Sequence, residues 1–427
     1  MTSTNPWQRF ATTKKGCRPF FLAPSESVPE APPSDDSNIQ PSAPPADSSP
    51  PWRTFLSKEA FQQQAADGAW RRWLALRKLA ETSERHARDR TRAASFVLPA
   101  NDASRNLVLA VNAALSLRRP LLLTGLPGSG KTTLAYAVAD WLGLGPVLEW
   151  SVTPGGTLAD ALATYDPLSR LQDLEIARKT ARNEQNQDSS SSDVPAPLPV
   201  EAYMRLGPVG TAFLPMPLPR VLLIDEIDKG DLNLAHELLH LFEEGKFPLP
   251  QLQRDSGSAA QGASVTPQIR TINSADEDEN GNPIPVSIQG AVVQCHEFPL
   301  VVMTSNGERE FPPAFNRRCL RVPMPDFSRD PASLKAIVRS HWEPSGSQRS
   351  SKPMALLDVA LQEFQEASTA ARGIGDSLAL DQLLNLAFLL EQEGAQLSEA
   401  TRQDLRAVVL QALNAEPEMP QDPGAAT

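Results

Sequence analysis

The stretch from Pro120 to Thr133 reads PLLLTGLPGSGKTT, and it constrains the fold more than any other part of the chain. Its three leucines predict a short buried strand, and the residues after Lys131 have the spacing of a helix. The glycine-rich turn between them matches the phosphate-binding pattern G-x-x-x-x-G-K-T over Gly125–Thr132. Strand, loop and helix in this order favour a phosphate-binding loop (P-loop) over an ordinary glycine turn.

Each residue type in this turn has a physical role. Glycines let the backbone curl so that successive N–H groups point at phosphate oxygens, and the helix beginning at Lys131 adds its positive N-terminal end. We expect Lys131 to reach the β- and γ-phosphates and the Thr132 hydroxyl to ligate Mg²⁺. The predicted nucleotide-binding residues are Gly125, Leu126, Pro127, Gly128, Ser129, Gly130, Lys131, Thr132 and Thr133.

A second apolar run ends in two adjacent carboxylates. Residues 220–228 read RVLLIDEID, so Asp225 and Glu226 follow a near-continuous apolar segment. This is the pattern of a buried parallel strand, and ligands of such sheets bind at the carboxyl ends of the strands. We therefore expect Asp225 to hold Mg²⁺ together with Thr132, and Glu226 to orient and activate a water molecule.

A third apolar run supplies further candidates. Leu300–Met303 predicts another buried strand, and Asn306 follows it with an amide suited to positioning the attacking water. Arg317 and Arg318 come shortly afterwards, before a short strand expected at Cys319–Val322.

Weaker patterns predict the remaining elements. Val147–Ser151 is expected to be a strand, and residues 96–119 a short extended piece followed by a helix. Residues 203–219 have the glycines and prolines of a bent hairpin, and Val286–Ile288 with Val292–Gln294 are expected to form a second hairpin.

Composition divides the chain into five parts. Residues 1–50 are rich in proline and serine and predict a disordered tail, because such a segment buries too little apolar surface to offset its ordering entropy. Residues 51–95 predict a helical arm that either packs on the core or docks a partner. Residues 96–328 predict the nucleotide-binding core, 329–415 a helical lid and 416–427 a frayed tail.

Charge, cysteine content and hydropathy narrow the class of protein. The net charge is −11 and the pI about 5.1, which disfavours nucleic acid as a partner, since phosphate-backbone binders carry basic patches. Three widely spaced cysteines indicate a reducing compartment. No apolar run approaches 18 residues and the first residues lack the apolar segment of a signal peptide, so we expect a cytoplasmic protein without membrane spans.

Residues 236–240 spell HELLH, which matches the zinc-protease pattern H-E-x-x-H. Helical spacing places His236 and His240 on one face, opposite the apolar residues that predict the core side. No third ligand is evident, so we interpret the pair as incidental rather than as a metal site.

In this order, the motifs resemble those of AAA+ ATPases. They are Walker A (GLPGSGKT), Walker B (VLLIDEID), a sensor-1 strand (VVMTSN), an arginine-finger segment (PPAFNRR) and a C-terminal helical lid. The segments before Walker B and before sensor 1 resemble the MoxR branch, also described as dynein-related. The resemblance covers about residues 96–415. It implies an α/β core with a five-stranded parallel sheet in the order 5-1-4-3-2 and a homo-oligomeric ring, usually a hexamer.

The resemblance also assigns roles by position. Lys131 and Thr132 bind phosphate and Mg²⁺, Asp225 and Glu226 are the Walker B pair, and Asn306 is sensor 1. The arginine finger falls on Arg318, with Arg317 as the alternative. Two departures stand out. Asp228 occupies a position where relatives often show Asn, and GIGDSLA lacks the expected sensor-2 arginine, for which Arg372 is the nearest substitute.

The expected activity is Mg²⁺-dependent ATP hydrolysis that remodels a client protein, often alongside a von Willebrand factor A-domain partner. A first alternative is a nucleotide-gated oligomeric switch that recruits partners through its N-terminal arm. A second is a nucleic-acid-associated NTPase like the McrB-type GTPases, which the acidic pI disfavours.

Overall fold

This computed structural model describes a subset of the chain, namely residues 12–13, 16–17, 50–64, 66–98, 102–184, 198–252, 268–271, 285–288, 291–325, 331–342, 357–370, 380–393 and 408–410. Arg372, most of the expected N-terminal tail and the expected C-terminal tail lie outside these residues. Within the first 49 residues, β1 (Thr12–Thr13) pairs antiparallel with β2 (Gly16–Cys17).

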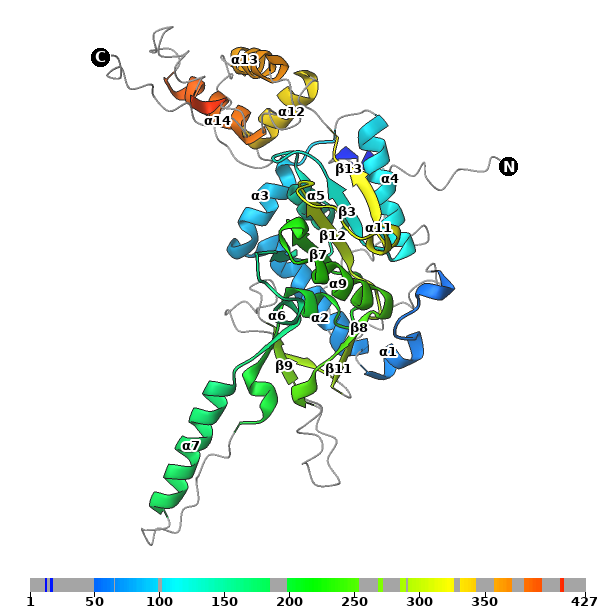
Figure 1. The fold of residues 1–427 in the computed structure, drawn as a ribbon, viewed down its shortest axis with the longest axis vertical. Coiled ribbons are helices and arrows are strands. Elements are labelled where there is room, and N and C mark those ends of the chain that lie inside the picture. Colours follow the sequence, from blue (N-terminus) through cyan, green and yellow to red (C-terminus); the bar gives the residue numbers. More distant parts are fainter. Residues whose placement is uncertain are drawn as a thin grey trace, which may run out of the picture.

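A five-stranded parallel sheet forms the centre of the molecule (Figure 1). Numbered along the chain, its strands lie in the order 5-1-4-3-2, as expected. From one edge to the other they are β13 (Leu320–Pro323), β3 (Leu121–Thr124), β12 (Leu300–Ser305), β7 (Val221–Asp225) and β4 (Leu148–Ser151). The central strand β12 is buried along its whole length, which explains its continuous apolar sequence.

Helices cover both faces of this sheet, and alternate strand residues belong to different cores. Leu121 and Leu123 pack in one core, whereas Leu122 packs in the other. The first face is covered by α3 (Ala87–Ser95), α4 (Asp102–Leu117) and α5 (Lys131–Leu142). The second is covered by α2 (Ala66–Thr82), α6 (Leu158–Leu162), α8 (Pro208–Ala212), α9 (Leu232–Glu244) and α11 (Pro313–Arg318).

The helical arm packs on this core. It contains α1 (Lys58–Gln64), α2 and α3. Trp73 and Leu76 of α2 are each only 1% exposed and lie in the same core as β4 and α9. The inner face of α2 is therefore not available to a partner, which favours the packed alternative over a free docking arm.

The two hairpins expected from the sequence, at residues 203–219 and at residues 286–294, do not form. β10 (Pro285–Ser287) pairs with β9 (Gln268–Thr271), whereas β11 (Val292–Gln294) pairs with β8 (Lys246–Pro248), so the two segments belong to different sheets. β10 and β9 continue through β6 (Met204–Leu206) to β5 (Ala163–Tyr165). Local alternation predicts a strand but not its partner, which is set by contacts distant in sequence.

After β6 the chain forms the short helix α8 in place of the expected bend. Pro208 occupies its first turn, where a missing N–H costs nothing. A Cβ on Gly207 would lie 2.2 Å from the carbonyl oxygen of Ala161, and one on Gly210 would lie 2.0 Å from that of Leu162. The glycines thus permit close packing against α6 rather than a turn.

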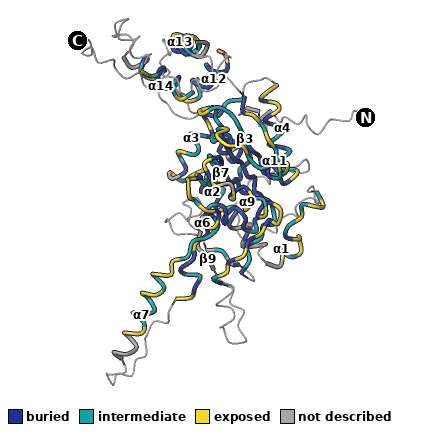
Figure 2. The backbone as a smooth tube through the Cα atoms, viewed as in Figure 1, coloured by how far each residue is buried: buried dark blue, intermediate teal, exposed yellow. Residues whose placement is uncertain are grey.

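Helix α7 (Pro167–Glu184) projects away from the body of the molecule (Figure 1), and its residues are mostly exposed or half-buried (Figure 2). Its base is fixed by Asp173, which accepts a hydrogen bond from the Tyr203 hydroxyl at 2.8 Å. No described helix is both long and apolar enough to cross a bilayer.

In the part of the chain that the structure describes, a separate bundle beyond the sheet contains the helices α12 (Pro331–Trp342), α13 (Leu357–Ala370) and α14 (Leu380–Glu393) (Figure 1). They share their own apolar core, which includes Val338, Phe364 and Leu386. The Ser340 hydroxyl donates a hydrogen bond to the carbonyl of Ser95 at 2.8 Å, which holds α12 beside the C-terminal end of α3. The bundle occupies the place expected for the lid.

Candidate nucleotide site

The P-loop follows β3 and leads into α5, as the sequence predicts. Gly128 and Gly130 have φ angles of 72° and 85°, in the region that favours glycine. The loop is also tightly packed, since a Cβ on Gly125 would lie 3.3 Å from Cβ of Met324. The glycines of this loop are therefore required by its backbone conformation and packing, in addition to the phosphate binding expected of it.

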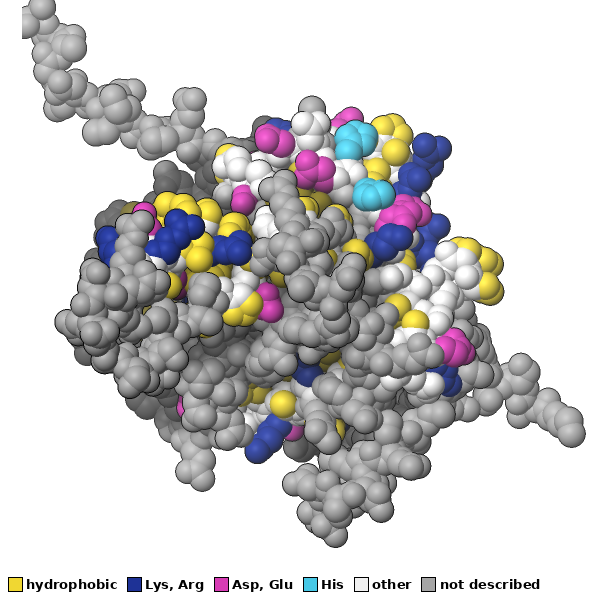
Figure 3. All heavy atoms as spheres, turned by 90° about the horizontal axis from the view of Figure 1, so that it is seen from below, with side chains coloured by type: hydrophobic (Ala, Val, Ile, Leu, Met, Phe, Trp, Pro, Cys, Tyr) yellow, Lys and Arg dark blue, Asp and Glu magenta, His cyan; other side chains and the backbone are white. Residues whose placement is uncertain are grey.

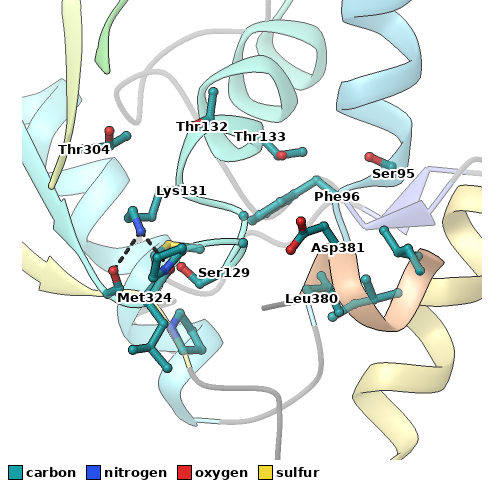
Figure 4. A pocket seen from close by; sticks show the side chains of 18 of the residues that line it. Ser95, Phe96, Ser129, Lys131, Thr132, Thr133, Thr304, Met324, Leu380 and Asp381 are labelled. Carbon is teal, nitrogen blue, oxygen red and sulfur yellow. Dashed lines mark hydrogen bonds between the residues drawn. The ribbon is translucent and has the colours of Figure 1, made fainter. Parts of the chain in front are cut away.

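Lys131 is buried against the loop that it follows. Its Nζ donates hydrogen bonds to the carbonyl oxygens of Gly125 at 2.7 Å and Leu126 at 2.8 Å (Figure 4). Burial lowers the pKa of Lys131, an effect opposed by the nearby carboxylates of Asp225, Asp228 and Glu226. The ammonium group is thus surrounded by acceptors that a bound phosphate would replace.

Asp225 lies at the end of β7 and is held by two hydroxyls. The Thr132 hydroxyl donates to its two oxygens at 3.1 and 3.2 Å. The Thr304 hydroxyl donates to Asp225 Oδ1 at 2.5 Å and accepts the backbone N–H of Glu226 at 2.9 Å. Because Mg²⁺ prefers such hard oxygen ligands, the Thr132 and Asp225 donor set fits this ion.

Glu226 has a constrained backbone at the mouth of the site. Its φ and ψ are 57° and 47°, a left-handed conformation that costs a non-glycine residue about 1–3 kcal/mol. Its Oε2 accepts a hydrogen bond from Lys229 Nζ at 2.7 Å, and this bond raises the pKa of Lys229. The candidate base is therefore ion-paired to a residue one turn away.

Asn306 lines the same cavity and is positioned through its backbone. Its N–H donates to Asp228 Oδ2 at 2.9 Å, and the N–H of Glu308 donates to the same atom at 3.1 Å. Asp228 is 3% exposed, and its other oxygen, Oδ1, has no hydrogen-bond partner among the described residues. Asp228 thus links the turn after β7 to the loop after β12.

These groups surround a cavity of about 450 Å³ between the sheet and the lid (Figure 4). One end is formed by the P-loop, Asp225 and Glu226. The Ser129 hydroxyl there is buried, and no described group forms a hydrogen bond with it. The other end is largely apolar and is lined by Phe96, Val97, Met324, Pro325, Leu334, Ile337, Phe364, Leu380 and Leu384. A polar phosphate end and an apolar base end fit a nucleotide.

Sequence reasoning missed this apolar end and the hydroxyl of Thr304. The apolar residues come from the segments after α3 and after β13 and from three lid helices. In the sequence, each of them resembles an ordinary core residue. Thr304 could have been found from its place one strand residue before the end of β12, since the polar ends of neighbouring parallel strands meet.

The two candidate arginines lie outside this cavity. Both end α11, and the Arg318 Nε donates to Glu243 Oε1 of α9 at 2.5 Å. Neither arginine is among the described residues that line the cavity of its own chain.

The two histidines of HELLH lie on the exposed face of α9, whereas Leu234, Leu238 and Phe242 are buried. The described residues contain no group of three or more metal-ligating side chains. Figure 3 shows histidine, acidic and basic side chains interspersed on the described part of the lower face, with no large basic patch there.

Comparison with protein-family models gives a match to the segment that contains these motifs. Residues 120–319 match the AAA domain model of the dynein-related subfamily. This segment is an AAA domain of that subfamily. Curated protein sequences gave no significant match.

Solved structures similar to the chain include NtrX from Brucella abortus in complex with ADP, at 14% identity and a TM-score of 0.38, covering 80% of this chain and 61% of NtrX. Hsp104 with casein shows 17% identity and a TM-score of 0.35, covering 77% of this chain and 50% of Hsp104. The Thermotoga maritima RuvB motor shows 15% identity and a TM-score of 0.32, covering 73% and 70%. The chain spans less than two thirds of the NtrX and Hsp104 chains.

Proposed function

We propose that this chain is a Mg²⁺-dependent ATP hydrolase of MoxR type that remodels a partner protein. The observation that carries the proposal is the cluster of Lys131, Thr132, Asp225 and Glu226 at one end of a cavity whose other end is apolar. A nucleoside triphosphate needs both ends, and hydrolysis needs an acceptor for the proton of water next to the phosphates.

Each residue has a distinct role in this mechanism. Lys131 exchanges the carbonyls of Gly125 and Leu126 for phosphate oxygens. Thr132 and Asp225 hold Mg²⁺, which when bound neutralises phosphate charge and orients the phosphates. Glu226 leaves Lys229 to accept a proton from the attacking water, and Asn306 positions that water.

The charge of the cavity supports assembly into a ring. Lys131 is the only lysine or arginine among its described lining residues, against the carboxylates of Asp225, Glu226 and Asp381. Charge developing on the transferred phosphate then needs a further cation. We propose that Arg318 of a neighbouring copy supplies it, with Arg317 as the alternative and a hexamer as the expected ring.

We further propose a cytoplasmic protein client, with a von Willebrand factor A-domain protein as the first partner to test. Trp73 is buried in the core, so less of the helical arm is free to recruit partners, which disfavours the nucleotide-gated switch. The acidic pI disfavours a nucleic-acid partner.

The test is steady-state phosphate release by the purified chain with ATP and Mg²⁺, alone and with candidate A-domain proteins. Mg²⁺-dependent turnover stimulated by a protein partner supports the proposal. No turnover under any of these conditions would contradict hydrolysis, and stimulation by DNA alone would favour the nucleic-acid alternative. The Glu226→Gln variant controls for contaminating ATPases.

A further inference from the structure

A carboxylate of the lid faces the nucleotide cavity. Asp381 lies in the first turn of α14, and its side chain points toward the P-loop beside Phe96 (Figure 4). The residue is exposed, and nothing in the described part of the chain pairs with its carboxylate. Its position is set by the lid, because its neighbours Leu380 and Leu383 pack in the core shared with α12 and α13.

The carboxylate of Asp381 would be unfavourable next to the phosphates of a bound nucleotide. Like charges repel, and the cavity already contains Asp225 and Glu226 beside its single described lysine. An acidic side chain at this place gains more from a neutral hydrogen-bond donor of the nucleotide than from its phosphates. A nucleotide offers two such donors between its base and its phosphates, the ribose hydroxyls, and a carboxylate accepts hydrogen bonds from both.

The arrangement of polar and apolar residues along the cavity indicates that Asp381 faces the ribose and not the base. The phosphates belong at the N–H groups of the P-loop, and the base belongs among the apolar residues. Phe96 and Met324 approach the loop closely, since a Cβ on Gly130 would lie 3.6 Å from Phe96 and 3.9 Å from Met324. Asp381 points to the junction of these two regions, where the sugar that joins base and phosphates has to lie (Figure 4).

We propose that Asp381 is a specificity-determining residue that accepts hydrogen bonds from the 2′- and 3′-hydroxyls of a bound ribonucleotide. This assignment rests on the proposed nucleotide function. It also gives the lid a direct role in binding: α14 closes on the sugar with an acceptor, while α12 closes on the base with Leu334 and Ile337.

The experiment measures the affinity of the full chain for Mg·ADP and for Mg·2′,3′-dideoxy-ADP by calorimetry. Because a hydrogen bond to a charged group is worth roughly a factor of ten or more, we expect wild type to bind ADP about tenfold more tightly than the dideoxy analogue. Asp381→Ala should lower the affinity for ADP and abolish the difference between the two nucleotides. The affinity for the analogue should be no lower than in wild type, because the variant also loses the repulsion between the carboxylate and the phosphates. Asp381→Asn, which keeps one acceptor oxygen, should retain part of the difference.

Asp358→Asn is the matched control, because Asp358 is an exposed lid carboxylate that pairs with Lys335 and lies outside the cavity. It should preserve the full difference between the two nucleotides. Equal affinities of wild type for both nucleotides, an equal loss of both in Asp381→Ala, or tighter ADP binding by that variant would each overturn the assignment. Failure of wild type to bind ADP at all would instead contradict the proposed nucleotide function.

Discussion

The Oδ2 atom of Asp228 accepts the backbone N–H of Asn306 at 2.9 Å. Asp228 follows β7 and Asn306 follows β12, so this bond joins the ends of two neighbouring strands that carry catalytic candidates. A second bond from Glu308 to the same oxygen fixes the loop on both sides of Gly307. The distance between Glu226 and Asn306 is thereby set by a residue that itself lies outside the cavity.

Asp228→Ala should therefore lower kcat more than it raises KM for ATP. Removing the carboxylate leaves two backbone N–H groups without their acceptor, which costs about 1–3 kcal/mol each where they are buried and frees the Asn306 loop. Steady-state kinetics and urea unfolding measure the two effects. Asp228→Asn keeps an acceptor oxygen and should retain most of the stability. A wild-type kcat in a folded Asp228→Ala protein would contradict this positioning role.

Lys131→Ala should weaken ATP binding by about 100-fold or more, because the phosphates lose a charged hydrogen-bond donor worth several kcal/mol in a partly buried site. The variant should also unfold at a slightly lower temperature, since the carbonyls of Gly125 and Leu126 lose their donor. Calorimetry gives the affinity, and a melting curve shows that the chain is folded. Unchanged affinity would remove Lys131 from the phosphate site.

Lys229→Met should raise the basal rate of ATP hydrolysis. The lysine holds Glu226 in an ion pair at 2.7 Å, and activity requires the carboxylate to exchange that partner for water. Both side chains are partly exposed, at 37% and 40%, so the pair is worth at most about 1 kcal/mol and the expected gain is at most about fivefold. Turnover without any partner measures it, and Lys229→Arg should restore the wild-type rate. A fall in kcat would mean that Lys229 assists Glu226 in hydrolysis and does not inhibit it.

The five central strands were predictable, and so was the grouping of Lys131, Thr132, Asp225 and Glu226 at one cavity, because each strand and each strand end depends on a local pattern. A parallel strand buried on both faces reads as an apolar run, and Leu300–Met303 and Leu222–Ile224 show it clearly. The strand partners of Val286 and Val292 were not predictable, because alternation carries no information about pairing. The roles of Thr304 and Asp381 depend on strand register and lid packing, which bring together residues far apart in sequence.

Replacing both His236 and His240 by Ala should leave ATP hydrolysis within a few-fold of wild type and change no metal content. Both side chains are exposed on α9, away from the cavity. Elemental analysis of the purified proteins is the measurement. Stoichiometric zinc in wild type that disappears from the double variant would show that the HELLH pair is a metal site after all.

Arg318 tests whether neighbouring copies complete each other's sites. Within one chain its guanidinium pairs with Glu243, and Arg318 is not among the described residues that line the cavity. An arginine supplied in trans contributes about 10³–10⁵ in rate. Arg318→Ala should therefore bind ATP normally and hydrolyse it poorly, whereas Glu226→Gln is inactive because its own site lacks the base. Mixing the two inactive proteins creates interfaces that pair an intact Glu226 with an intact Arg318 from the neighbour.

We expect such mixtures to regain ATP hydrolysis once tagged subunits are shown to co-assemble. Recovery requires no new chemistry, since each protein supplies the group that the other lacks across an interface. Arg317→Ala mixed with Glu226→Gln is the matched control, because Arg317 is the exposed neighbour on the same helix. If Arg317→Ala alone is inactive and recovers on mixing while the Arg318→Ala mixture stays inactive, the finger is Arg317. If co-assembled mixtures of both kinds remain inactive, the cation that completes this site does not come from either arginine of a neighbouring copy.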